Sequence, residues 1–239
     1  MMIRGTSILL AVLSAALVGC ASTKKEHLVA PSATIAPYAA DGIEVVFAVI
    51  PLRNESGTTT VDCGVLTDKL IAAAEDIQGV RTIPQNAVIK AMAANGISQI
   101  RSEQEASAVA GALGVDALLV GTVNAYDPYA PTIGMTIALI GAAGATIAAG
   151  NPSPTLSIVS NNLDGKSQQV QIDVRDYAVG RVPPNSALSW RRYLASMDLF
   201  SEFACHRTLR DLMNKEWNRL GKTPPSATND KKSNADAKK

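Results

Sequence analysis

The stretch Glu44-Val45-Val46-Phe47-Ala48-Val49-Ile50-Pro51-Leu52 decides the fold class of this chain. It is a nearly continuous apolar run rich in β-branched residues, a pattern typical of a strand that is buried on both faces. Pro51 and the polar residues 53–57 then predict that the strand ends in an exposed loop. A strand covered on both sides indicates a layered domain in which helices pack against a sheet.

Helix and strand patterns alternate downstream of this run. Apolar residues on one helical face predict a helix over 61–78, and a short strand follows over 80–83. Pro84 begins a second helix, and a capping box that starts at Ser102 begins a third. The apolar residues 116–125 predict another strand. The order strand, helix, strand, helix, helix, strand is an α/β arrangement.

The second half of the chain adds strands and a long helix. Residues 133–139 alternate between larger apolar and small residues, which predicts a strand. Strands over 156–160 and 169–177 flank an Asp-Gly turn signal and are interpreted as a β-hairpin. Residues 187–220 are helical, with a break near Asp198. We therefore predict an α/β (α+β) domain: a mixed β-sheet flanked by helices, with an added hairpin and a long C-terminal helix.

The N-terminus has the pattern of a bacterial secretory signal. Arg4 precedes an apolar stretch over 8–18 that is too short for a standard spanning helix. The run Leu17-Val18-Gly19-Cys20 resembles a lipobox, in which the cysteine is acylated, for example by palmitate, and becomes the mature N-terminus. Ala21 stands where an Asp favours inner-membrane retention in enteric-type bacteria, so the resemblance implies the outer membrane. The alternative is a soluble secreted protein with Cys20 near an ordinary cleavage site.

Composition divides the chain into four parts. Residues 1–19 are the signal peptide, and 20–40, rich in Ala, Ser, Thr and Pro, are a flexible lipid-anchored tether. Residues 41–221 form a single α/β domain, and the lysine-rich residues 222–239 form a disordered polar tail. The chain is 47% hydrophobic but only 4% aromatic, which predicts an aliphatic core. Its formal net charge of +1 gives no field that would attract nucleic acid.

Two cysteines remain besides Cys20. Cys63 and Cys205 could pair as a disulfide in an oxidising periplasm, which would tie an early segment to the last helix. The alternative is two small buried thiols. The sequence alone does not give the separation that decides between them.

The uncharged segment 132–150 has three interpretations. It is a buried strand followed by a loop of small residues, a hairpin that inserts into a membrane, or a helix against a membrane or a partner. In the second interpretation the membrane-contacting side chains are Ile133, Met135, Ile137 and Leu139.

Catalytic and metal-binding patterns are absent from the sequence. His27 and His206, the two histidines, have no metal-ligand spacing, and no nucleophile elbow, HExxH motif or phosphate-binding loop occurs. Asp173 and Asp176 fall on opposite sides of the predicted strand, so they do not form an acid pair. We expect no enzyme activity, no cofactor and no metal.

Two motifs resemble a family of bacterial envelope proteins. The first is Phe47-Ala48-Val49-Ile50-Pro51-Leu52-Arg53-Asn54-Glu55-Ser56-Gly57, followed by the pair Gly79-Val80. The second is Leu113-Gly114-Val115-Asp116-Ala117-Leu118-Leu119-Val120-Gly121-Thr122-Val123. The family includes CsgG, PelC, LpoB and the TolB amino-terminal domain. The resemblance implies an anticodon-binding-like α/β domain that acts through protein contacts.

Three functions follow as hypotheses. The first is a non-enzymatic, periplasm-facing outer-membrane lipoprotein that serves as a structural or accessory component of an envelope assembly, secretion or export system. Its partners would be the membrane, through acylated Cys20, other envelope proteins and copies of itself. The second is a tethered regulator that activates a cell-wall enzyme, and the third is a ring-forming pore that inserts 132–150. Asn54, Glu55 and Ser56 are the predicted contact loop, with an ordinary solvated turn as the alternative.

Overall fold

Strand β2 (Val45–Val49) is the strand predicted from the apolar run, and it lies inside a mixed sheet, with a neighbouring strand on each side. The computed structural model describes residues 31–151, 153–183, 186 and 188–224. Within them, β2 pairs in parallel with β5 (Val80–Thr82) and with β6 (Ala117–Asp127). Phe47 and Ala48 point to opposite faces of the sheet and are both fully buried. The fold class is therefore α/β, as predicted.

The sheet changes from parallel to antiparallel pairing after β6. The strand order is β5-β2-β6-β7-β8, with β7 (Thr132–Gly141) and β8 (Thr155–Asp164) each antiparallel to its predecessor. A short connection joins β6 to β7, and such connections favour antiparallel neighbours because parallel strands need a crossover. The remaining strands are β3 (Arg53–Asn54), which continues along β6, and the parallel pair β1 (Thr34–Ile35) and β4 (Ile77–Gln78).

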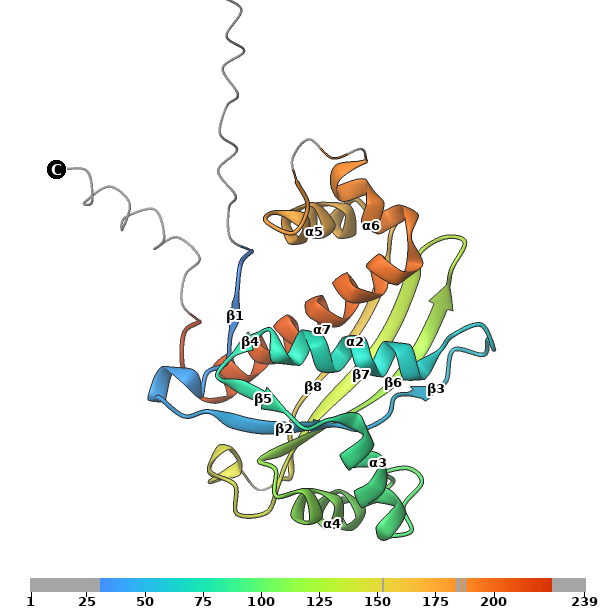
Figure 1. The fold of residues 1–239 in the computed structure, drawn as a ribbon. Coiled ribbons are helices and arrows are strands. Elements are labelled where there is room, and N and C mark those ends of the chain that lie inside the picture. Colours follow the sequence, from blue (N-terminus) through green and yellow to red (C-terminus); the bar gives the residue numbers. More distant parts are fainter. Residues whose placement is uncertain (1–30, 152, 184–185, 187, 225–239) are drawn as a thin grey trace, which may run out of the picture.

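Helices cover the sheet unevenly. Two long helices lie across one face, while a shorter pair packs on β2 and β6 from the other side (Figure 1). Among the described residues, the α-helices are α2 (Cys63–Glu75), α3 (Gln85–Ala94), α4 (Glu103–Leu113), α5 (Gln168–Ala178), α6 (Arg192–Ala195) and α7 (Met197–Arg219). Short 3₁₀ turns are η2 (Ala39–Asp41), η3 (Thr146–Ala148) and η4 (Ser189–Arg191).

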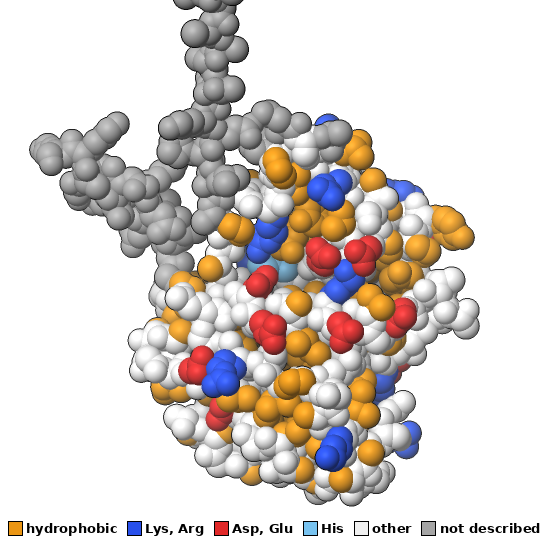
Figure 2. All heavy atoms as spheres, viewed as in Figure 1, with side chains coloured by type: hydrophobic (Ala, Val, Ile, Leu, Met, Phe, Trp, Pro, Cys, Tyr) orange, Lys and Arg blue, Asp and Glu red, His pale blue; other side chains and the backbone are white. Residues whose placement is uncertain are grey.

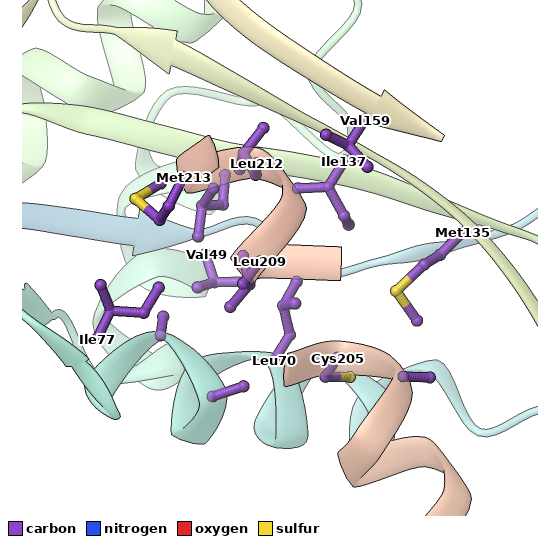
Figure 3. Close-up of a cluster of buried hydrophobic side chains, with 14 of the residues drawn as sticks. Val49, Leu70, Ile77, Met135, Ile137, Val159, Cys205, Leu209, Leu212 and Met213 are labelled. Carbon is purple, nitrogen blue, oxygen red and sulfur yellow. The ribbon is translucent and has the colours of Figure 1, made fainter. Parts of the chain in front are cut away.

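The main core lies between the sheet and the α2/α7 pair. Leu70 from α2 and Leu209 from α7 converge on Val49 and Ile137 of the sheet (Figure 3). These side chains are at most 1% exposed, and burying each contributes roughly 1.5–3 kcal/mol. Aliphatic side chains dominate this cluster, as the composition predicts.

The capping box predicted for the third helix is confirmed. The Ser102 hydroxyl accepts from the Glu105 backbone N–H at 3.2 Å, and the Glu105 carboxylate accepts from the Ser102 N–H at 3.1 Å. Gly114 ends the helix in the left-handed region with φ 64°. The first helix ends at Glu75 rather than at 78, because Ile77 and Gln78 pair with β1 instead.

The hairpin predicted for 156–160 and 169–177 is wrong in its second strand. The segment 169–177 belongs to α5, and β8 pairs with β7. Val170 and Val174 are buried one helical turn apart, whereas Ile172 between them is 46% exposed. In a strand all three would share one face, so alternation over a short stretch was mistaken for period two.

The folded domain begins earlier than residue 41. Ile35 lies in β1, and the side chains of Ala36 and Tyr38 are buried in the core. Trp217 of α7 donates its indole N–H to the Ile35 carbonyl at 3.0 Å. The second half of the predicted tether is therefore part of the domain. The signal peptide, the lipidation at Cys20, His27 and most of the predicted tail lie outside the described residues.

The segment 132–150 forms β7 and the connection to β8, as in the first of the three interpretations. Its alternating side chains Ile133, Met135, Ile137 and Leu139 are 0% exposed, because α7 covers them. This corrects the hypothesis that they contact a membrane, and with it the pore that would insert 132–150. None of the helices in the described part of the chain is long and apolar enough to cross a bilayer.

The C-terminal helical region is shorter than predicted and interrupted. Its break falls at Ser196, two residues before the predicted position, and separates α6 from α7. Ser196 also caps α7, since its hydroxyl accepts from the Leu199 N–H at 3.4 Å.

Candidate protein-contact surface

A cleft lies at the carboxyl end of β2, where the chain crosses toward β3. Its walls are residues 50–55, the loop 98–100 between α3 and α4, and residues 120–121 of β6. The cleft has a volume of about 370 Å³. In α/β sheets, the carboxyl ends of parallel strands are the usual position of binding sites.

The chain crosses from β2 to β3 with Leu52 packed closely against Gly121. A Cβ atom on Gly121 would lie 2.8 Å from Cδ2 of Leu52 and 2.3 Å from Cδ1 of Ile137. Only a residue without a side chain leaves room there. The Leu52 N–H, which no strand partner takes, donates to Oγ1 of Thr67 on α2 at 3.0 Å.

The predicted contact loop has a shape set by its own hydrogen bonds. Oδ1 of Asn54 accepts from the backbone N–H of Ser56 at 3.0 Å and from its hydroxyl at 2.7 Å. Nδ2 of Asn54 donates to the Thr58 carbonyl at 2.6 Å. Such side chain to backbone bonds hold a turn in one conformation. The loop is therefore ordered before any partner binds, which lowers the entropic cost of binding.

The structure brings two of the three predicted residues to the cleft. Asn54 and Glu55 line it, whereas Ser56 lies in the loop outside the lining residues. The Glu55 carboxylate pairs with the Arg53 guanidinium at 2.9 Å, with both side chains well exposed. Their role in binding another protein stays a prediction.

Strand β8 presents a second surface that the sequence patterns did not reveal. In the described part of the chain, no strand pairs with its outer side. The Ile158 carbonyl points to that side, since it accepts from Nζ of Lys215 at 2.6 Å. An unpaired edge of ten residues is a template for a strand from another chain.

The sheet face away from α7 is partly exposed at β7 and β8. Ile158 is 49% exposed there. Next to it a polar row crosses three strands, as Asn124 donates to Thr136 at 3.1 Å and Thr136 donates to Ser160 at 2.9 Å. The sequence signal that could have indicated this exposed face was the alternation of polar and apolar residues over 156–164.

The two cysteines are free thiols, so the predicted disulfide is not formed. Cys205 is fully buried in the core, and its thiol contacts the Leu66 carbonyl at 3.9 Å. Burial raises the pKa of Cys205 to about 12. The alternative of two thiols is what the structure shows, although Cys63 is only partly buried.

The predicted acid residues of the second half are arranged differently from the prediction. Asp173 lies on α5 and its carboxylate pairs with the Arg207 guanidinium of α7 at 2.6 Å, while Asp176 is exposed on the same helix. Within the described ranges, no three His, Cys, Asp or Glu side chains converge to hold a metal ion. The expectation that the protein is not an enzyme stays a prediction.

No family model matches the chain, and no curated protein matches it. Solved structures similar to it include the LpoB C-terminal domain from Salmonella enterica, at 13% identity over 52% of this chain and 87% of that one, with a TM-score of 0.40. The lipoprotein GNA1162 from Neisseria meningitidis is 19% identical over 50% and 80%, with a TM-score of 0.37. A PelC dodecamer from Paraburkholderia phytofirmans is 13% identical over 72% and 88%, with a TM-score of 0.38.

Proposed function

We propose that the protein is a non-enzymatic lipoprotein of the outer membrane that faces the periplasm and serves as an accessory component of an envelope assembly, secretion or export system. The lipobox pattern ending at Cys20 supports the anchor. The motifs over 47–57 and 113–123 support a domain that acts through protein contacts. The ordered contact loop and the free edge of β8 offer surfaces for such contacts.

The observation that carries this proposal is the place where the chain enters the fold. Thr34 is already paired in β1, so only 13 residues separate it from Cys20, the predicted lipidation site. Even fully extended, that segment spans at most about 50 Å. The domain is therefore kept close to the outer membrane. This position favours a component of a machine in that membrane over a regulator that must reach an enzyme elsewhere in the envelope.

Strand addition at β8 is the contact we propose for assembly, either with a second copy or with an envelope partner. Lys215 covers one carbonyl of this edge, and the exposed Ile158 supplies apolar area beside it. Backbone pairing gives affinity, and the side chains of alternate residues give specificity.

The test compares variants that remove the predicted lipid anchor or redirect it to the inner membrane. Wild type, Cys20→Ser and Ala21→Asp are expressed in a strain lacking the gene, with Ala21→Ser as the matched control. Labelled palmitate and membrane fractionation report lipidation and location. The secreted-protein profile and survival with a cell-wall antibiotic report the two candidate functions.

We expect Cys20→Ser to lose the label and Ala21→Asp to move to the inner membrane and lose the secretion phenotype, while Ala21→Ser retains it. If Ala21→Asp keeps full function and only antibiotic survival depends on the protein, the regulator is the correct function. A wild-type protein without palmitate would refute the anchor.

A further inference from the structure

A groove between α2 and α7 gathers four carboxylates. Asp68 and Asp76 come from α2, and Asp198 and Glu202 come from α7. Residues four or eight apart on a helix share a face, so both helices turn these side chains toward the same hollow. The groove measures about 430 Å³, which lies within the usual range of ligand sites. Figure 2, drawn from this side, shows acidic side chains gathered on the α2/α7 face.

The positive charge in the groove is too small to neutralise the four carboxylates. Among the described residues that line it, Lys69 is the single cation. Its ammonium is engaged by Asp198 at 2.7 Å and by Glu202 at 3.3 Å. The carboxylates of Asp68 and Asp76 have no ion-pair partner in the described part of the chain. Four negative charges against one positive charge leave a site with a strong preference for cations.

A buried histidine at the groove is the second, independent observation. His206 lines the groove, is only 7% exposed, and has no hydrogen-bond partner among the described residues. Its ring packs against that of Tyr177, with 4.8 Å between centroids. A buried polar group without a partner is unfavourable, and groups of this kind commonly await a ligand. Burial lowers the pKa of His206 to about 4, so the neutral ring can accept a hydrogen bond from a cation.

Two of the three arginines near His206, Arg207 and Arg181, are engaged elsewhere, while Arg210 has no ion pair in the described part of the chain. Arg207 pairs with Asp173 at 2.6 Å and with Asp211 at 2.9 Å. The Arg181 guanidinium stacks on the ring of Tyr177, 4.1 Å from its centroid. These contacts hold both guanidinium groups in place, so neither takes the acceptor position that His206 presents to the groove.

We propose that the α2/α7 groove binds a lysine or arginine side chain from a basic segment of a partner protein. Asp68 and Asp76, two helical turns apart along α2, attract the basic segment by charge, and one of its side-chain cations donates a hydrogen bond to the His206 ring. This inference goes beyond the proposed function, because the groove is separate from the cleft and from β8. Its test requires neither a known partner nor a known location in the envelope.

The experiment measures peptide binding to the full-length protein in a non-ionic detergent. The probe is a fluorescein-labelled hexa-arginine peptide, followed by fluorescence anisotropy at two salt concentrations. A hexa-citrulline peptide keeps the shape and removes the charge. The variants are Asp68→Asn with Asp76→Asn, and His206→Leu with His206→Gln as its rescue. Glu44→Gln with Glu103→Gln is the control, since it removes two exposed charges outside the groove.

We expect arginine to bind at least about tenfold more tightly than citrulline, and the double Asp variant to lose about tenfold while the control loses less than about twofold. His206→Leu weakens binding and His206→Gln, which retains an acceptor, restores most of it. Equal losses in the double Asp variant and the control would show general charge attraction and overturn the proposal. Equal binding of both peptides would overturn it as well. The double Asp variant alters exposed side chains, so it decides the question even if His206→Leu does not fold.

Discussion

Tyr38 donates its phenolic hydrogen to Oε2 of Glu216, across 178 residues of sequence. Glu216 is 0% exposed and also accepts from the Ser157 hydroxyl and from the Arg219 guanidinium, whose Nη2 lies 2.7 Å away. Arg219 extends the network to the Ile147 carbonyl at 3.0 Å. This buried network joins the N-terminal segment, the β7–β8 connection and α7. It fixes the point at which the N-terminal segment enters the domain.

Replacing Glu216 should destabilise the domain strongly. Glu216→Ala leaves Arg219, Tyr38 and Ser157 without their acceptor in a buried site, and breaking such a network costs about 3–5 kcal/mol. Urea unfolding followed by circular dichroism measures the change. Glu103→Ala, on an exposed helix surface, should change stability by less than about 0.5 kcal/mol. Similar values for both variants would mean that the network contributes nothing.

The core position of β7 gives a second prediction. Ile137→Ala should lower the free energy of unfolding by about 2–5 kcal/mol because it leaves a cavity beneath α7. Ile158→Ala, at a half-exposed position on β8, should cost far less. Neither variant should change how the protein partitions into detergent. A change in partitioning with unchanged stability for Ile137→Ala would restore the membrane-contact hypothesis.

Two glycine substitutions should act in opposite directions. Gly121→Ala brings a Cβ atom within 2.3 Å of Ile137 and 3.0 Å of the Thr136 carbonyl, so it should destabilise by about 1–3 kcal/mol. Gly111→Ala meets no atom within 4 Å and lies inside α4, so it should stabilise by about 0.5–1 kcal/mol. Thermal unfolding compares the two. Equal changes in melting temperature for the two variants would show that the crossing of Leu52 over β6 does not depend on Gly121.

Assembly through β8 should depend on which side of the strand is altered. The backbone groups of Asn162 face the same outer side as those of Ile158, since alternate residues share a side. Asn162→Pro should therefore remove self-association and keep the fold. Asn161→Pro removes a bond to β7 and should lower stability instead. Light scattering of the protein in detergent measures the assembly, and an unchanged mass for Asn162→Pro would place the contact elsewhere.

Stability should fall in mild acid because of His206. Its pKa is lowered to about 4 by burial, with Arg181, Arg210 and Arg207 adding to the effect, whereas the unfolded side chain titrates near its ordinary value of 6.5. The unfolded state thus binds more protons between these pH values, and stability is lost as the pH falls through that window, by roughly 3 kcal/mol in total. Urea unfolding at pH 7, 5.5 and 4 should show the loss, and His206→Gln should reduce it. A slope that His206→Gln leaves unchanged would assign the loss to other groups.

Strong local signals predicted the first half of the chain well. The apolar run at Val45–Val49, the capping box at Ser102 and the end of that helix at Gly114 each act through neighbouring residues, and each is confirmed. The α5 segment failed because Val170, Ile172 and Val174 fit both a strand and a helix over so few residues. Packing of Val170 and Val174 against the core decided for the helix. Asn54 and Glu55, which the loop signal alone singled out, line the cleft, and their role in protein contacts stays a prediction.

The sequence by itself determined the elements whose cause is local: the buried strand, the caps, the turns and the lipobox pattern at Cys20. Tertiary structure alone decided the position of β8 at the edge of the sheet. It also decided that Ile137 faces α7 rather than lipid, and that Cys63 and Cys205 stay unpaired. It also brought His206 beside carboxylates from another helix. The physical reason is that periodicity reports which side chains share a face, whereas what covers that face depends on contacts between residues far apart in the chain.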